Sequence, residues 1–133
     1  DLESYSQTKR EQLILNLKAR TERLFAKQGS VYGITPEGTR SGETGEIRQA
    51  NTGIAQLEKY APKDKPLIYL PVAITLNKFS QNPEVVVGKP QTLAQIIESS
   101  QMDIAAASLQ QVADMHMYRL AALIPEHLRG HYR

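Results

Sequence analysis

The apolar positions of this 133-residue chain begin with a helical period. From residue 6 to residue 28 they recur every three or four positions, with lysines and arginines between them. This spacing predicts an amphipathic helix that packs one face against a sheet. Ser6 or Thr8 is a suitable N-terminal cap, and Gly29 a suitable stop. The predicted apolar face consists of Leu13, Ile14, Leu17, Thr21, Leu24 and Phe25.

Three later segments are rich in β-forming residues and predict strands. Residues 30–35 form the first, which ends at Pro36. Residues 67–76 are apolar at nearly every position, as in a central strand that is covered on both faces. Pro71 interrupts this run, and proline cannot donate a ladder hydrogen bond, so we expect the strand to bend or stop pairing there. Residues 84–87 form the third strand.

Helical patterns separate and follow these strands. A short helix is predicted for residues 51–60, with Asn51 or Thr52 as its cap. Thr92 and Gln95 have the spacing of a capping box that opens a second short helix. A long helix is predicted from about residue 100 to residue 124, where Pro125 ends it. The short helix has Ile54, Leu57 and Ala61 on one face, and the long helix has a stripe of Leu109, Val112, His116, Leu120 and Leu123.

The order of these elements predicts the fold class. Helix, strand, loop, helix, two strands and two helices indicate a single α/β domain over residues 1–133, with a mixed or mostly parallel sheet and flanking helices. We expect the polar tail, residues 126–133, to be frayed.

Composition excludes several kinds of function. The absence of cysteine removes disulfides, thiolate catalysis and cysteine-based metal sites. A net charge of +2 and the absence of tryptophan argue against nucleic-acid binding. No apolar stretch approaches the length of a membrane span.

The loop at residues 36–48 has the side chains of an oxyanion site. Gly38 lets the backbone approach a ligand, Thr39 and Ser41 offer hydroxyl groups, and Arg40 offers a planar fork that grips phosphate. Glu37 cannot bind an anion while ionised, so we expect it to orient Arg40 or to accept a hydrogen bond from a substrate hydroxyl. The alternative is a surface turn in which Glu37 and Arg40 only pair with each other.

The amino-acid sequence of this loop resembles a signature of a known family. Pro36-Glu37-Gly38-Thr39-Arg40-Ser41 resembles the third signature block of the glycerolipid acyltransferases, the family that includes 1-acylglycerol-3-phosphate acyltransferase; Thr35 stands where family members have Phe. Three further segments follow in the family's order, so the resemblance covers roughly residues 10–133. They are the helix start at 53–57, the apolar run with an internal proline at 70–74, and the strand ending in Gly-x-Pro at 85–90.

The resemblance implies a substrate, a donor and a location. It implies that Glu37, Gly38, Thr39, Arg40 and Ser41 bind the phosphate of a glycerol-based acceptor, with lysophosphatidate as the expected one. Pro71 is implied to form part of the active-site wall. The acyl donor would be acyl-CoA or acyl carrier protein, and no cofactor is implied. Members of this family usually work at the cytoplasmic side of a membrane, held peripherally or through segments that this chain lacks.

Two departures limit what the resemblance implies. Family members often carry Lys before the helix glycine, where this chain has Asn51-Thr52; Arg48 is a possible substitute. The family's catalytic His-x-x-x-x-Asp block, in which the histidine is the general base, is not found. We therefore expect the C-terminal part of an acyltransferase domain that is inactive by itself and assign no catalytic residue. A non-catalytic phospholipid-binding module and a structural α/β domain remain as alternatives.

The three histidines do not replace that block. His116, His127 and His131 all follow the loop, and none has Asp five positions later. His116 lies on the helical stripe, so we expect it to be packed. His127 and His131 have a spacing that can ligate metal on a helix, but we expect a frayed tail and assign no metal site. Asp114 and His116 are two positions apart and should not face each other on a helix.

Overall fold

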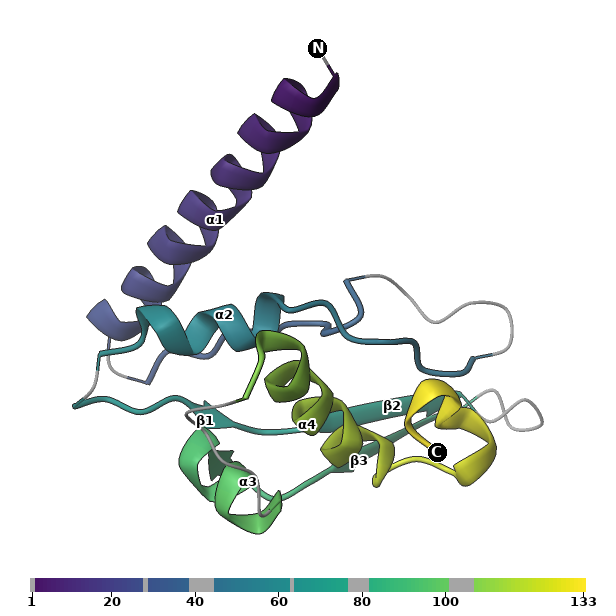
Figure 1. Cartoon of the computed structure of the whole chain (residues 1–133). Helices are drawn as coiled ribbons and strands as arrows, with labels where there is room; N and C mark the ends of the chain where they lie inside the picture. Colours follow the sequence, from purple (N-terminus) through teal and green to yellow (C-terminus); the bar gives the residue numbers. More distant parts are fainter. Residues whose placement is uncertain (1, 28, 39–44, 63, 77–81, 101–106) are drawn as a thin grey trace.

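The computed structural model describes residues 2–27, 29–38, 45–62, 64–76, 82–100 and 107–133. A long helix, α1 (Leu2–Ala26), projects from a body built of shorter helices and two small antiparallel sheets (Figure 1). The body contains α2 (Gly53–Tyr60), α3 (Leu93–Ser100), α4 (Leu109–Ala121) and two short 3-10 turns, η1 (Glu126–Leu128) and η2 (Gly130–Tyr132). The α/β class is confirmed at this level.

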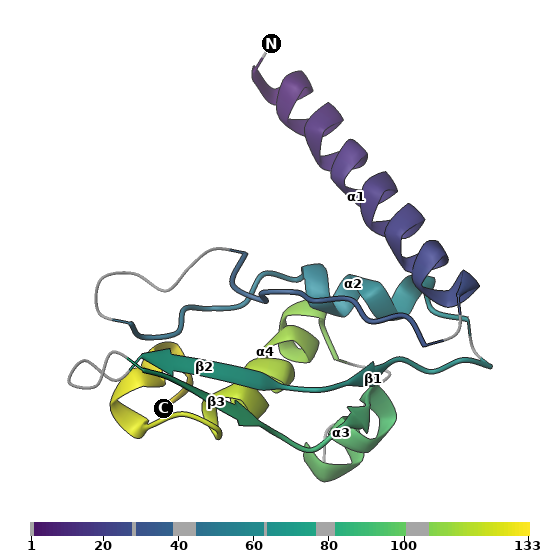
Figure 2. The same ribbon diagram turned by 180° about the vertical axis from the view of Figure 1, so that it is seen from behind.

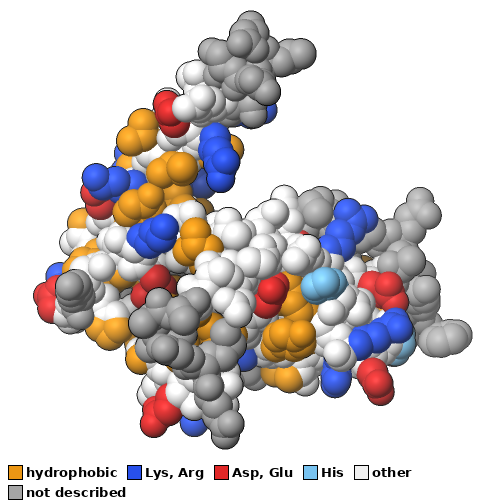
Figure 3. Space-filling view, viewed as in Figure 1, with side chains coloured by type: hydrophobic (Ala, Val, Ile, Leu, Met, Phe, Trp, Pro, Cys, Tyr) orange, Lys and Arg blue, Asp and Glu red, His pale blue; other side chains and the backbone are white. Residues whose placement is uncertain are grey.

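The predicted first helix is present, but it does not cover a sheet. It begins at Leu2, so residues 6 and 8 lie inside the helix and do not cap it. Leu13 is 61% exposed, and apolar and basic side chains lie side by side on the projecting helix (Figure 3). Only the C-terminal part packs, where Thr21 is buried and α1 contacts α2. Gly29 follows the helix end with φ +76°, as the predicted stop requires.

The predicted strand at residues 67–76 divides at its proline. β1 (Ile68–Tyr69) pairs with β4 (Gln91–Thr92), and β2 (Val72–Leu76) pairs with β3 (Pro83–Val87). Pro71 lies between β1 and β2, and its carbonyl accepts a hydrogen bond from the Gly88 N–H at 2.9 Å. The expected interruption is therefore confirmed.

The prediction of a mixed or mostly parallel sheet is wrong for the described residues. Both strand pairs are antiparallel. For β2 and β3 the reason is that their connection is too short for the crossover that parallel strands need. The run at 67–76 is also not covered on both faces. Ala73 is buried, but the other face of the β2–β3 pair exposes Val72, Ile74, Leu76, Val85 and Val87.

Residues 30–35, predicted as a strand, have no regular secondary structure. They run alongside α2 and past β1 (Figure 2) without joining either sheet. Val31 is 95% exposed. β-propensity alone does not form a strand when no ladder partner lies beside it.

The two C-terminal helices both have capping boxes. Thr92 and Gln95 form the predicted one at α3, with the Thr92 N–H donating to Gln95 Oε1 at 2.9 Å. The long helix predicted from residue 100 starts later, at Leu109, because Ser108 and Gln111 form a second capping box. Residues 101–106 of that prediction lie outside the described part.

The core lies between α2, α4 and the C-terminal turns. Met117 on α4 is completely buried at its centre. Its other buried members are Ile47, Ala50, Ile54, Ala55, Ala73, Ala113, Ala121, Ile124 and Tyr132. Ile96, Ile97 and Met115 form a smaller cluster where α3 meets α4.

Candidate functional site

The described part of the predicted anion loop is a tight turn. The Gly38 N–H donates to the Thr35 carbonyl at 2.9 Å, and Gly38 has φ +70°. Glycine adopts this left-handed conformation without steric cost. Thr39, Arg40 and Ser41 lie outside the described residues, so the structure gives no position for the predicted phosphate ligands.

Asn51 attaches this turn to the start of α2. Its backbone N–H donates to the Pro36 carbonyl at 2.8 Å, and its side-chain Nδ2 donates to the Glu37 carbonyl at 2.8 Å. The predicted caps are wrong in detail: Thr52 occupies the cap position without a side-chain cap bond. Sequence spacing did not indicate this role of Asn51, because Asn51 contacts Pro36 and Glu37 only in the folded chain.

Glu37 has a structural partner in the segment that follows the loop. Its Oε2 accepts a hydrogen bond from the backbone N–H of Arg48 at 2.8 Å. An ionised acceptor makes this bond stronger than one between neutral groups. The carboxylate therefore holds the two ends of the loop together, a role that the sequence did not indicate. The expected contact between Glu37 and Arg40 is not tested, because Arg40 lies outside the described residues.

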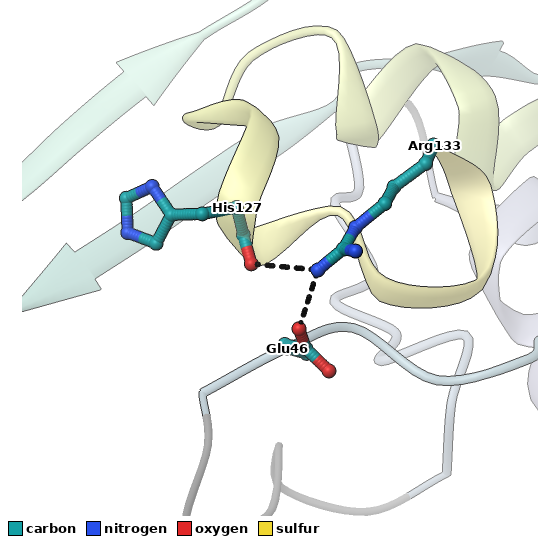
Figure 4. Close-up of polar contacts among 3 residues, drawn as sticks. All are labelled: Glu46, His127 and Arg133. Carbon is teal, nitrogen blue, oxygen red and sulfur yellow. Dashed lines mark hydrogen bonds and ion pairs between the residues drawn. The ribbon is translucent and has the colours of Figure 1, made fainter.

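The C-terminal tail holds the same segment from the other side. Arg133 forms an ion pair with Glu46 at 2.7 Å and reaches the His127 carbonyl at 3.5 Å (Figure 4). The Ile47 N–H donates to the Leu128 carbonyl at 3.0 Å. The prediction of a frayed tail is wrong, because these contacts supply partners for its backbone and charges.

Inside the core, Tyr132 attaches the C-terminal tail to segment 45–50 and to α4. Its hydroxyl accepts from the Ala50 N–H at 2.8 Å and donates to Asp114 Oδ1 at 2.7 Å. Asp114 thus faces Tyr132, whereas His116 packs on the ring of Tyr69, with ring centroids 4.3 Å apart. The prediction that Asp114 and His116 do not face each other is confirmed. These contacts connect the core and the C-terminal tail to segment 45–50, and segment 45–50 to the turn at residues 35–38.

Gly38 gives a direct test of the turn. A Cβ built on Gly38 would lie 2.6 Å from Asn51 Nδ2, whereas a Cβ on Gly29, which has a similar φ, meets open space. We expect Gly38→Ala to lower the free energy of unfolding by about 2–3 kcal/mol, through backbone strain and loss of the Asn51 hydrogen bond. Gly29→Ala should cost about 1 kcal/mol, from strain alone. Urea denaturation of both variants measures the difference, and equal losses would contradict the contact with Asn51.

A large apolar cavity adjoins the turn. Its volume is about 1010 Å³, and Pro36 forms part of its wall. The wall is built by the end of α1, segment 29–36, α2, segment 65–72 and α4, and it includes Pro71. The sequence did not predict this cavity, because its wall combines segments that are distant along the chain.

Three buried polar atoms at or near this cavity have no hydrogen-bond partner among the described residues. They are His116 Nε2, Tyr69 Oη and Glu58 Oε1. His116 is 6% exposed, and burial together with the neighbouring Arg119 charge lowers the pKa of its imidazole to about 4. Burial raises the pKa of Tyr69 well above its ordinary value, and the nearby Glu58 carboxylate raises it further. His116 is thus packed, as predicted, and neutral at pH 7.

Histidine–carboxylate pairs and metal sites are both absent from the described residues. No carboxylate in this part of the chain forms an ion pair with a histidine. Over the same residues, no three His, Cys, Asp or Glu side chains come together as a metal site. Within the described ranges, none of the helices combines the length and apolar character that crossing a bilayer requires.

Comparisons with known proteins leave the family open: no family model matches the chain, and neither the curated proteins nor the solved structures contain a match.

Proposed function

We propose that this chain is the acceptor-binding part of a glycerolipid-type acyltransferase domain. It would bind the phosphate of lysophosphatidate or a related phosphorylated glycerol at residues 36–41, for acyl transfer from acyl-CoA or acyl carrier protein. The block Glu37-Gly38-Thr39-Arg40-Ser41 motivates this proposal through its resemblance to that family. Arg40 would hold the phosphate bidentately, with Thr39 and Ser41 adding hydroxyl donors.

The observation that carries the proposal is the fixed turn at the start of this block. Pro36 and Glu37 accept hydrogen bonds from the backbone of Arg48 and from the backbone and side chain of Asn51. Anchoring of Pro36 and Glu37 lowers the conformational entropy that this part of the loop would lose when a ligand binds. A purely solvated turn has no need of such attachments.

The position of the turn also suits a lipid. Pro36 is shared between the turn and the wall of the apolar cavity. A headgroup at the loop would therefore leave its apolar chain beside a surface that excludes water. Binding sites for small molecules commonly combine such an apolar cavity with a few fixed polar groups.

We expect the chain to bind the acceptor without transferring the acyl group. The general base of the family is absent, and His116 is buried without a carboxylate that orients it among the described residues. Incubation with acyl-CoA and lysophosphatidate should give no phosphatidate above background. Turnover by this polypeptide alone would contradict the assignment.

A non-catalytic phospholipid-binding module is the second candidate, because binding of the acceptor needs no general base. The sequence of the complete gene distinguishes the acyltransferase from the binding module. A His-x-x-x-x-Asp block encoded shortly upstream of Asp1 in the natural protein supports the enzyme, and its absence there supports the binding module. A peripheral position at the cytoplasmic side of a membrane is part of both proposals.

Arg40→Ala tests the phosphate contact. Loss of a charge-assisted bidentate contact should weaken lysophosphatidate binding about 10- to 100-fold. Isothermal titration gives both affinities, and Arg10→Ala is the matched control, because Arg10 is an exposed arginine on the projecting helix. Equal affinity of Arg40→Ala and wild type would leave the structural α/β domain, with Glu37 and Arg40 only paired, as the better account.

A further inference from the structure

The charged residues that line the apolar cavity are all basic. Lys27, Lys65 and Arg119 contribute to its wall, and no Asp or Glu among the described residues does. The remaining lining is mainly aliphatic and aromatic, including Leu24, Phe25, Ile34, Leu57 and Leu120. An apolar space with basic charges alone is complementary to an amphiphile with an anionic group.

Polar side chains that can bind such an anion lie together at one corner of the cavity. His116 and Arg119 are three positions apart on α4 and therefore lie on the same side of the helix. Tyr69 reaches this corner from β1 and stacks against His116. All three residues line the cavity. His116 Nε2 has no hydrogen-bond partner within the described residues, so a bound group can satisfy it without breaking an existing bond. The Tyr69 hydroxyl lies beside the Glu58 carboxylate.

Arg119 is fixed in place but keeps donors available. Its Nη2 donates to the Lys89 carbonyl at 2.6 Å, and no carboxylate of the described residues forms an ion pair with it. A guanidinium has five N–H groups in a planar fork. One of them is used by Lys89, which orients the fork and leaves other N–H groups for a ligand. Burial lowers the pKa of Arg119, so a nearby negative charge would gain from a partly desolvated cation.

We propose that this cavity is a binding site for a free long-chain carboxylate, with the carboxylate at Arg119 and His116 and the hydrocarbon chain along the apolar wall. Charge and shape both favour a carboxylate over a phosphate at this corner. A single guanidinium matches a single negative charge and the planar geometry of a carboxylate. This site is separate from residues 39–41 and does not depend on the proposed phosphate contact.

Displacement of a fluorescent 18-carbon polyene fatty acid by palmitate measures this site on the intact chain. All concentrations must stay below those at which palmitate aggregates. Wild-type protein should bind palmitate at least about 10-fold more tightly than hexadecanol, which has the same chain length without the charge. Hexadecanol that competes as well as palmitate would overturn the proposal, and this comparison needs no variant.

Arg119→Met tests the residue assignment, because Met keeps much of the apolar stem and removes the charge. We expect it to weaken palmitate binding about 10-fold or more, while Arg10→Met leaves it unchanged. Arg40→Ala should also leave palmitate binding unchanged, so failure of the phosphate site and failure of the carboxylate site give different results. Palmitate binding that responds to Arg40→Ala and not to Arg119→Met would overturn the proposal. So would a cavity that takes lysophosphatidate and excludes palmitate.

Discussion

Tyr132→Ala is expected to lower the free energy of unfolding by about 3–5 kcal/mol, the cost of removing a buried aromatic side chain. Tyr132 is 2% exposed and packs edge-on against Tyr118 and His131, with ring centroids 5.1 and 5.0 Å away. Its removal also leaves the Ala50 N–H without the hydroxyl that accepts its hydrogen bond. Urea denaturation followed by circular dichroism measures the loss.

Two milder variants separate packing from hydrogen bonding. Tyr132→Phe keeps the ring and removes the hydroxyl, so we expect a loss of about 1–3 kcal/mol from the unsatisfied Ala50 N–H. Tyr118→Phe is the matched control, because Tyr118 is largely exposed, and it should change stability by less than about 0.5 kcal/mol. If Tyr132→Ala were as stable as wild type, the tail would be frayed after all.

The second large effect is an acid-induced loss of stability caused by His116. Its pKa is about 4 in the folded protein, against an ordinary value of 6.5. Between these two pH values the unfolded state binds a proton that the folded state does not, so stability falls as the pH is lowered. The contribution is fully present above pH 6.5 and is lost progressively down to about pH 4. Its full size is about 3 kcal/mol.

His116→Phe isolates this contribution because it removes the titrating group and keeps an aromatic ring against Tyr69. Unfolding free energies measured from pH 7.5 to pH 4 should fall less steeply for His116→Phe than for wild type. His127→Gln, at an exposed position, should retain the wild-type slope. If His116→Phe and wild type lost stability in parallel, His116 would not be the buried neutral group described above.

Local chemistry was predictable from the sequence where neighbouring residues decide the outcome. Gly29 at the end of α1, the capping box of Thr92 and Gln95, and the interruption at Pro71 each depend on a few adjacent residues. The burial of His116 followed from its place in the apolar stripe of α4. In the first three cases the controlling residues lie within a few positions of one another, and in the fourth the helical period alone places His116 on the packed face of α4.

The remaining features depend on contacts between distant residues. Residues 30–35 have the composition of a strand but lack a ladder partner in the described structure. The tail looked polar and mobile, yet Arg133 pairs with Glu46, and Tyr132 reaches Ala50. No local pattern gives these pairings, because the partners are 87 and 82 positions apart along the chain.

The features of the candidate site also divide into those that neighbouring residues decide and those that depend on distant contacts. Composition and motif located the loop, but the attachments of Glu37 and Asn51 came from the structure. The cavity was not predictable, since its wall combines segments that are distant along the chain. Sequence reasoning thus supplied a hypothesis for the headgroup, and the fold supplied the apolar space beside it.

The central claim is that the loop at residues 36–41 binds the phosphate of the acceptor. Titration of ¹⁵N-labelled protein with short-chain lysophosphatidate, followed by amide chemical shifts, tests it most directly. The account predicts the largest saturable shifts at the Gly38 and Arg48 amides, which lie in the turn and on Glu37, and their loss in Arg40→Ala. Saturable shifts confined to residues outside this loop, or no shift at Gly38 at saturation, would contradict it.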